Sequence, residues 1–266
     1  MKLPSFRKSL LALSFVFTLT PSLALAEDIN VLAAASLKYV LEDIKGEFLK
    51  TRPNDSIQVS YISSGKAYAQ IQNGSPTHLF IAADTSYPQK LYDEKLAASK
   101  PTNYAKGKLV LMSANKNFAL KQKMSIPQVI EILKNPKLTH IAIPNPKVAP
   151  YGKAALEFLT MQGINETLQP KLSVGDSIGQ ATSFVLEGAS EIGFSALSMV
   201  IKDTKTPHLS YALIDEDTYT AINQALIVPK HGKNSKLTAD FVAFILTSKS
   251  AKDLLQSYGY DTPDSK

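Results

Sequence analysis

Four segments of the sequence place small or hydroxyl-bearing residues directly after an apolar stretch and directly before a predicted helix. They are residues 33–37 (AAASL), 62–66 (ISSGK), 149–153 (APYGK) and 176–179 (DSIG). The first turn of a helix leaves backbone N–H groups without partners and carries the positive end of the helix dipole, so it can bind an anion. Together the four segments predict a site that surrounds one small anion with uncharged hydrogen-bond donors.

Each of these segments also fits a purely structural role. Serine is a favoured N-terminal capping residue, so a single segment of this kind more often caps a helix than binds a ligand. Asp176 is the one acid beside a proposed donor, and a helix cap is its favoured role. Two such segments in each of two predicted domains favour the anion site, because ligands of open α/β sheets bind at the carboxyl ends of the strands.

The elements that must position these segments follow from the hydrophobic pattern. Apolar runs predict strands at residues 29–34, 57–62, 79–83, 109–113, 141–143, 172–174, 192–195 and 222–228. Helical spacing of apolar residues predicts helices at 37–49, 66–73, 89–95, 126–133, 153–161, 179–186, 237–246 and 251–258. The alternation predicts an α/β fold with mainly parallel sheets.

The number of strand–helix units exceeds what one small sheet needs, so we expect two domains. Strands 109–113 and 222–228 are the expected crossings between them. The expected division places residues 27–107 and 224–266 in domain 1 and residues 108–223 in domain 2.

Residues 1–26 are typical of a secretory signal peptide. Three basic residues precede an apolar stretch over 9–19, Pro21 interrupts it, and a small-x-small motif ends at Ala26. An uncleaved membrane anchor is the alternative, but the apolar stretch is only marginally long enough to span a bilayer. Because the chain has no cysteine that could be lipid-modified, the sequence predicts a soluble periplasmic protein, cleaved after Ala26.

Composition excludes several classes of function. Beyond the predicted signal peptide the chain has 26 basic and 23 acidic residues, which provides no dense basic face for nucleic acid. The absence of cysteine excludes disulfides and thiolate chemistry. Arg52 is the only arginine after the signal peptide, so a bidentate carboxylate-binding site is not expected. The four histidines show no metal-ligand spacing.

Several segments together resemble the periplasmic molybdate-binding proteins of ABC importers. They are INVLAAASLKYVLEDIKGEF, YISSGKAYAQIQNGSP, LFIAAD, NPKVAPYGKAALEFL, QATSFVLEGASEIGFSALS and SYGY, and they extend over nearly all of residues 27–263. The resemblance implies two α/β domains of the type II periplasmic-binding-protein fold, joined by a two-strand hinge and closing over a dehydrated oxyanion. It also implies a monomer without cofactor or catalysis, which delivers molybdate or tungstate to a membrane permease with a cytoplasmic ATPase.

The same resemblance implies the residues of the site. Ser36 and Ser64 would donate hydroxyl and backbone N–H bonds from domain 1, whereas Tyr151 and Ile178 would donate backbone N–H bonds from domain 2. Molybdenum would be present only as the oxyanion bound by these residues. Some family members add a tyrosine hydroxyl where this sequence has Ala196, and the hydroxyl of Ser195 or of Tyr151 is the expected replacement.

Strand alternation also predicts that the side chain of Ser63 points away from that of Ser64. A site made only of donors suits an anion that is fully deprotonated at neutral pH, so sulfate or another tetrahedral oxyanion is an alternative ligand. An exported serine hydrolase is an alternative of another class. Residues 193–197 (GFSAL) approach the G-x-S-x-G pattern around Ser195, and His208 and His231 follow in the sequence.

Overall fold

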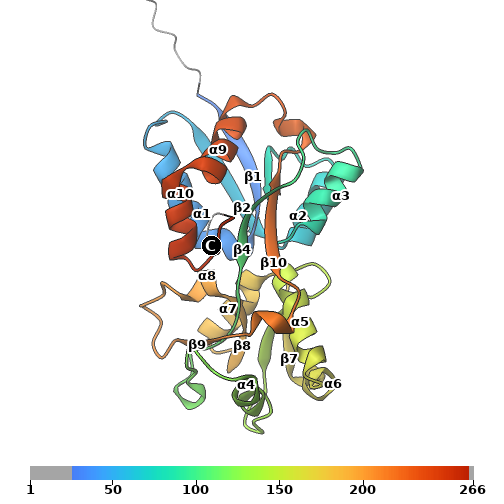
Figure 1. Cartoon of the computed structure of the whole chain (residues 1–266), viewed down its shortest axis with the longest axis vertical. Coiled ribbons are helices and arrows are strands. Elements are labelled where there is room, and N and C mark those ends of the chain that lie inside the picture. Colours follow the sequence, from blue (N-terminus) through green and yellow to red (C-terminus); the bar gives the residue numbers. More distant parts are fainter. Residues whose placement is uncertain (1–25, 264–266) are drawn as a thin grey trace, which may run out of the picture.

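The computed structural model describes residues 26–263, so the predicted signal peptide lies outside the described residues except for Ala26. The chain forms two lobes stacked along its long axis, each built around a five-stranded sheet with helices packed on it (Figure 1). We call the lobe that contains residues 26 and 263 lobe 1 and the other lobe 2. The predicted α/β fold class is confirmed.

Lobe 1 holds a mixed sheet with the strand order β2-β1-β3-β10-β4. Its strands are β1 (Asp28–Ala34), β2 (Ser56–Ile62), β3 (Leu79–Ile81), β4 (Thr102–Gly107) and β10 (Ile222–Ile227). Its helices are α1 (Lys38–Leu49), α2 (Ser64–Gln72), α3 (Ser86–Asp93), α9 (Lys236–Thr247) and α10 (Lys249–Ser257). Strand β1 is parallel to β2 and β3, whereas β10 is antiparallel to β3 and β4. Figure 1 shows α1, α9 and α10 on one side of this sheet and α2 and α3 on the other.

Lobe 2 holds a second mixed sheet with the order β7-β6-β8-β5-β9. Its strands are β5 (Leu109–Ser113), β6 (Ile141–Pro144), β7 (Leu172–Gly175), β8 (Ile192–Ala196) and β9 (Ser210–Leu213). Its helices are α4 (Ile126–Leu133), α5 (Pro150–Met161), α6 (Asn165–Leu168), α7 (Ile178–Leu186) and α8 (Leu197–Val200). Strand β6 is parallel to β7 and β8, and β5 is antiparallel to β8 and β9.

Each lobe packs aromatic rings in its core. In lobe 1 the ring of Phe48, on the apolar face of α1, lies 5.0 Å from that of Phe241 on α9. In lobe 2 Phe158 of α5 and Phe194 of β8 meet edge to face at 6.0 Å. Such pairs add to the free energy gained by burying the rings. The first pair packs α1 against α9, and the second packs α5 against the sheet of lobe 2.

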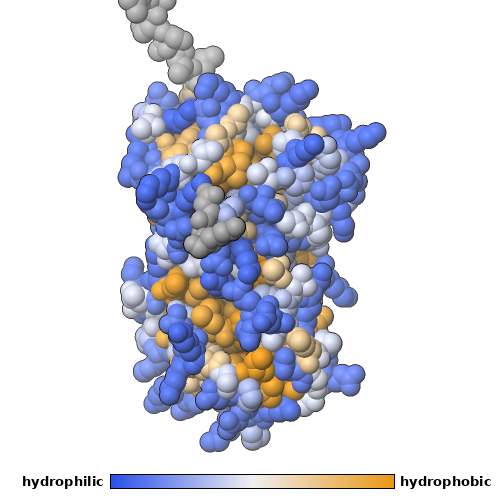
Figure 2. Space-filling model, viewed as in Figure 1, coloured by the Kyte–Doolittle hydropathy of each residue, from blue (hydrophilic) through white to orange (hydrophobic). Residues whose placement is uncertain are grey.

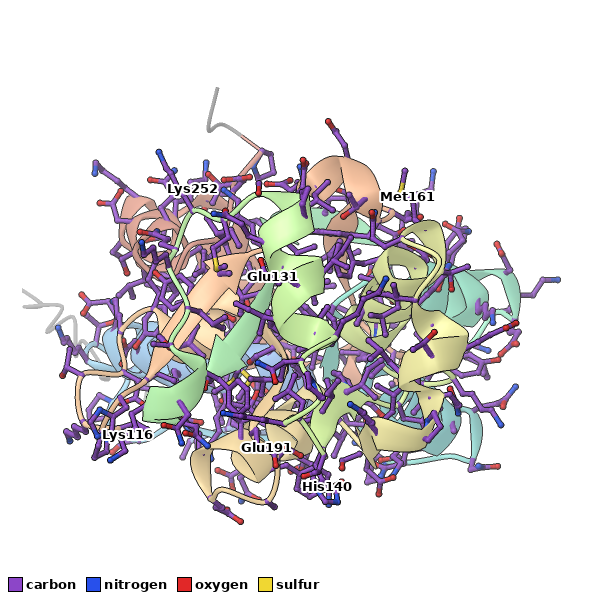
Figure 3. All side chains as sticks on the ribbon, turned by 90° about the horizontal axis from the view of Figure 1, so that it is seen from below. Lys116, Glu131, His140, Met161, Glu191 and Lys252 are labelled. Atoms are coloured by element: carbon purple, nitrogen blue, oxygen red, sulfur yellow. The ribbon has the colours of Figure 1, made fainter. Side chains whose placement is uncertain are left out.

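The end of lobe 2 far from lobe 1 is seen from below in Figure 3, which labels Glu131 on α4 and the neighbouring residues His140 and Glu191. The Glu191 carboxylate accepts hydrogen bonds from the backbone N–H of His140 at 2.8 Å and from the Thr139 hydroxyl at 2.6 Å. These bonds hold the starts of β6 and β8 together. Hydrogen bonding to Thr139 and His140 keeps the pKa of Glu191 below its usual value against the opposing effect of burial.

The chain crosses between the lobes at two places that the sequence pattern located only approximately. Strand β4 leads through Lys108 into β5, and residues 214–221 connect β9 to β10. The expected crossing strands therefore need correction, because β5 lies wholly in the sheet of lobe 2 and β10 in that of lobe 1. The domain boundaries remain a prediction.

Strands β4 and β9 were not predicted. Strand β4 (TNYAKG) is buried mainly at Tyr104, Ala105 and Gly107, so it offers no apolar alternation. Strand β9 has only four residues.

Within residues 26–263 no helix combines the length and the apolar character needed to cross a bilayer. Figure 2 shows apolar residues on the visible face of both lobes, over a larger area of the lower lobe, and hydrophilic residues around most of the outline.

Candidate functional site

The four segments singled out from the sequence meet between the lobes. A small cavity there is lined by residues from all four, together with Ala83: Ala34, Ala35, Ser36, Ile62, Ser63, Ser64, Ala83, Ala149, Pro150, Tyr151 and Ile178. The structure therefore brings together Ser36, Ser64, Tyr151 and Ile178, the four predicted site residues. The cavity is small, with a volume of about 10 Å³.

Three helices begin at the cavity. The first residue of α2 is Ser64 and that of α7 is Ile178, and α5 begins with Pro150. Because proline has no N–H group, Tyr151 provides the first backbone donor of α5. The first N–H groups of a helix have no partner inside it. The three helix termini thus direct backbone donors and the positive ends of their dipoles at one small volume.

Ser36 comes from the short 3-10 helix η1 (Ala35–Leu37), which directly follows β1. Its side chain is 1% exposed, and its hydroxyl oxygen has no hydrogen-bond partner among the described residues. The carbonyl oxygen of the same residue is fixed from two sides, by the hydroxyls of Ser198 at 2.8 Å and Tyr260 at 3.0 Å. A buried hydroxyl without a partner costs about 1–3 kcal/mol, which an anion in the cavity would offset.

Ser64 is fully buried, and its hydroxyl oxygen accepts a hydrogen bond of 3.0 Å from the backbone N–H of Ala83. A hydroxyl that accepts through its oxygen can still donate its hydrogen. The bond from Ala83 therefore orients the Ser64 hydroxyl and leaves its hydrogen for a ligand.

The side chain of Tyr151 extends away from the cavity towards the connection between the lobes. Its hydroxyl accepts a hydrogen bond of 3.1 Å from the Gln224 side chain, whose carbonyl oxygen accepts one of 2.6 Å from Tyr104. A Cβ atom added to Gly107 of β4 would clash with this hydroxyl, which shows how closely Tyr151 approaches that strand. Complete burial raises the pKa of Tyr151 well above its usual value. The hydroxyl of Tyr151 therefore lies away from the cavity and does not replace the missing donor.

Ser195 does not replace it either. Its hydroxyl lies 2.7 Å from that of Thr182, which in turn donates to the carbonyl oxygen of Ile178 at 2.8 Å. This chain of contacts supports the first turn of α7, and Ser195 is not among the lining residues of the cavity. Ala196, which ends β8, is buried and has no side-chain donor.

The geometry around Ser195 also bears on the hydrolase alternative. Ser195 is fully buried, and within residues 26–263 no hydrogen bond joins its hydroxyl to a histidine. His231 packs edge to face on His78, at 4.5 Å between ring centroids. A serine nucleophile needs a histidine base within hydrogen-bonding reach, so this arrangement does not support acyl transfer.

Asp176 lies at the rim of the cleft, where its carboxylate pairs with the ammonium group of Lys66 of lobe 1 at 2.7 Å. It is not the cap of α7. Ser177 takes that role, and its hydroxyl accepts from the N–H of Gln180 at 3.2 Å. No charged side chain is among the described residues that line the cavity, so the donors there are uncharged.

Further contacts join the lobes at the same rim. The backbone N–H of Gly65 donates to the carbonyl oxygen of Val148 at 2.9 Å, and the Tyr87 hydroxyl donates to that of Lys147 at 3.3 Å. A larger hollow of about 390 Å³ adjoins the cavity and shares Ala83, Ala149 and Pro150 with it. Its lining includes Asp84, Lys90, Lys147 and Lys153.

Comparison with known proteins agrees with this architecture. The family of bacterial extracellular solute-binding proteins matches residues 29–261 of the chain. The chain belongs to this family. The chain is 36% identical over 258 residues to the molybdate-binding protein ModA of Azotobacter vinelandii, an alignment that covers 96% of this chain and 98% of that protein. It is 33% identical over 240 residues to ModA of Rhodobacter capsulatus, with 90% of each chain covered.

The fold agrees with solved structures of the same kind. The periplasmic molybdate-binding protein of Azotobacter vinelandii superposes with a TM-score of 0.78 at 32% identity, covering 88% of this chain and 99% of that one. The sulfate-binding protein SubI of Mycobacterium tuberculosis superposes with a TM-score of 0.70 at 15% identity, covering 90% and 88%. The likeness to SubI shows the fold alone. The predicted resemblance to periplasmic molybdate-binding proteins and the predicted two-lobed fold are both confirmed.

Three polar residues in or next to the cavity, Gln224, Ser63 and Tyr260, were not identified from the sequence. Gln224 lies in the mostly apolar strand β10 (INQALI), and a polar residue there was the available sign of a buried partner. Ser63 was expected to face away, yet it lines the cavity beside Ser64. Tyr260 was noticed only as part of the SYGY segment, and its contact with Ser36 spans 224 positions of sequence.

Proposed function

We propose that this chain is a periplasmic binding protein that captures molybdate or tungstate between its lobes and delivers it to a membrane ABC permease with a cytoplasmic ATPase. The observation that carries the proposal is the buried, unpartnered hydroxyl of Ser36 in a cavity with no charged side chain in its lining. The similarity to proteins named for molybdate binding supports the choice of anion.

In the proposed complex each site residue has a defined role. Ser36 and Ser64 donate hydroxyl and backbone N–H bonds from lobe 1. Tyr151 and Ile178 donate backbone N–H bonds from lobe 2. All of these groups are donors, which suits a dianion that keeps no proton at neutral pH, and charge-assisted hydrogen bonds are the stronger ones.

The remaining expectations belong to the same proposal. The mature protein begins after Ala26 and acts in the periplasm as a monomer, without a cofactor and without catalysis. Its domain 1 comprises residues 27–107 and 224–266, and its domain 2 comprises residues 108–223. The ligand moves from the closed cleft to the permease when the lobes separate.

Sulfate is the second candidate ligand, and the observation that favours it is the uncharged donor lining. Molybdate and sulfate carry the same charge at neutral pH, so only the size of the closed cavity can separate them.

A thermal-shift panel of molybdate, tungstate, sulfate and phosphate tests the proposal. A ligand at about 100 times its dissociation constant stabilises the protein by roughly 2.7 kcal/mol. We expect molybdate and tungstate to raise the melting temperature and sulfate at equal concentration to do much less. Equal shifts with sulfate, or no shift with molybdate, would refute the assignment.

A further inference from the structure

Ser63, which precedes α2, has a hydroxyl that nothing in the fold explains. The residue is 3% exposed, and its hydroxyl oxygen has no hydrogen-bond partner among residues 26–263. Ser63 lines the cavity between the lobes together with Ser36 and Ser64. Burying such a group without a partner is costly, so a fold that retains it calls for an explanation.

Helix capping does not account for this hydroxyl. Ser63 is the N-cap residue of α2 and has the extended backbone typical of one, yet its side chain makes no capping bond. Its carbonyl oxygen accepts from Ala67 at 3.0 Å in the ordinary way. The same chain uses two other N-cap serines conventionally, since Ser177 accepts from Gln180 and Ser235 accepts from Thr238.

Few hydroxyl groups in the cavity lining are placed to contact a ligand. Of the lining residues, Ser36, Ser63, Ser64 and Tyr151 carry hydroxyls. The Tyr151 hydroxyl lies against Gln224 of β10, away from the cavity. We propose that the Ser63 hydroxyl donates a hydrogen bond to the bound oxyanion, as a third side-chain donor beside Ser36 and Ser64. This inference rests on the proposed function and adds a donor to its site.

With this assignment the two lobes contribute different kinds of hydrogen-bond donor to the bound anion. All three hydroxyl donors then come from lobe 1, and lobe 2 contributes only the backbone N–H groups of Tyr151 and Ile178. Lobe 1 would hold the anion first, and closure of lobe 2 would complete the shell.

The test is titration calorimetry with molybdate on the Ser63→Ala protein. A hydrogen bond to a charged group corresponds to roughly 10- to 150-fold in affinity, and we expect a loss in that range. Ser190→Ala is the matched control. Ser190 is also 3% exposed with an unpartnered hydroxyl, but it lies in lobe 2 outside the cavity lining. We expect wild-type affinity for Ser190→Ala, and ligand-free melting temperatures close to wild type for both variants.

The outcomes separate this inference from the proposed function. If the wild-type protein binds molybdate and Ser63→Ala binds it equally well, the inference is overturned while the proposed function stands. If the wild-type protein binds no molybdate, both fail together. Should Ser63→Ala not fold, Ser63→Gly removes the same hydroxyl without adding an apolar methyl group and is measured in its place.

Discussion

The hydroxyl of Ser198 in lobe 2 donates a hydrogen bond of 2.8 Å to the carbonyl oxygen of Ser36 in lobe 1. The Tyr260 hydroxyl lies 3.0 Å from both that carbonyl oxygen and the Ser198 hydroxyl. All three residues are buried. A residue proposed to bind the anion is therefore also a point where the closed lobes are joined, so ligand binding and closure share one peptide group.

The first prediction concerns this contact. Ser198→Ala should weaken molybdate binding by roughly 2- to 10-fold, because a neutral hydrogen bond contributes about 0.5–1.5 kcal/mol and this one exists only when the lobes are closed. Thr247→Ala is the control, since its exposed hydroxyl donates to the carbonyl oxygen of Ala243 within α9 of lobe 1. Titration calorimetry measures both. An affinity loss for Thr247→Ala as large as that for Ser198→Ala would contradict the coupling.

The second prediction concerns the two predicted serine donors. Ser36→Ala and Ser64→Ala should each weaken molybdate binding by roughly 10- to 150-fold, the range expected for a hydrogen bond to a charged group. The two losses need not add, since both donors act on one anion. Ser235→Ala is the control, because it removes the cap of α9 and lowers stability by about 1 kcal/mol without touching a residue of the cavity lining. A double Ser36→Ala/Ser64→Ala protein with wild-type affinity would refute the site.

The position of the cavity could be predicted because its parts are local features of the sequence. Segments such as 33–37 and 149–153 carry strand ends and helix starts in their own composition. In both sheets the parallel strands then bring these junctions to one edge. The presence of Ser63 in the cavity lining was not expected, for a related reason. Side chains alternate only while the backbone stays extended, and the helix begins at Ser64, directly after Ser63.

The hydrogen-bond network of Tyr104, Tyr151 and Gln224 could not be predicted, because its contacts join distant parts of the chain. Gln224 bonds to Tyr151 across 73 positions and to Tyr104 across 120. Neither tyrosine carries a local sign of that partner. The strand that holds Tyr104 was itself missed, since its sequence mixes polar and small residues.

The third prediction addresses that network. Gln224→Leu should lower the free energy of unfolding by about 1–3 kcal/mol, because the buried hydroxyl of Tyr151 loses its Gln224 donor and that of Tyr104 loses an acceptor. Gln58→Leu, on the exposed face of β2, should stay within about 0.5 kcal/mol of wild type. Urea denaturation without ligand measures both. A stability of Gln224→Leu equal to that of Gln58→Leu would mean that the network contributes nothing.

The fourth prediction concerns the ion pair across the cleft. Lys66→Ala removes the ion pair with Asp176. The side chain of Lys66 is 44% exposed and that of Asp176 is 69% exposed. Exposed pairs contribute about 0.2–1 kcal/mol, so molybdate binding should weaken by at most about fivefold, and the difference should shrink at high salt. Lys249→Ala breaks the pair with Asp253 within α10 and should leave affinity unchanged. A salt-independent loss for Lys66→Ala would show that charge attraction is not the cause.

The fifth prediction follows from Asp84, which lies in the hollow beside the cavity. Burial is the largest influence on its carboxyl group and raises its pKa, against the opposing effects of a bond from Ser86 and of the charges of Lys153 and Lys90. A carboxyl group whose pKa is raised in the folded state makes folding less favourable at neutral pH. That cost disappears as the pH falls through the folded pKa towards the unfolded value of about 3.9.

Asp84→Asn should therefore be more stable than wild type at pH 7, and its advantage should shrink as the pH is lowered towards 4. Denaturant titrations of both proteins at several pH values, without ligand, measure this difference. Asp93→Asn is the control, because Asp93 is an exposed carboxylate at the end of α3, on the same lobe. If the advantage of Asp84→Asn stayed constant or grew towards pH 4, burial of the charged carboxylate would not be its source.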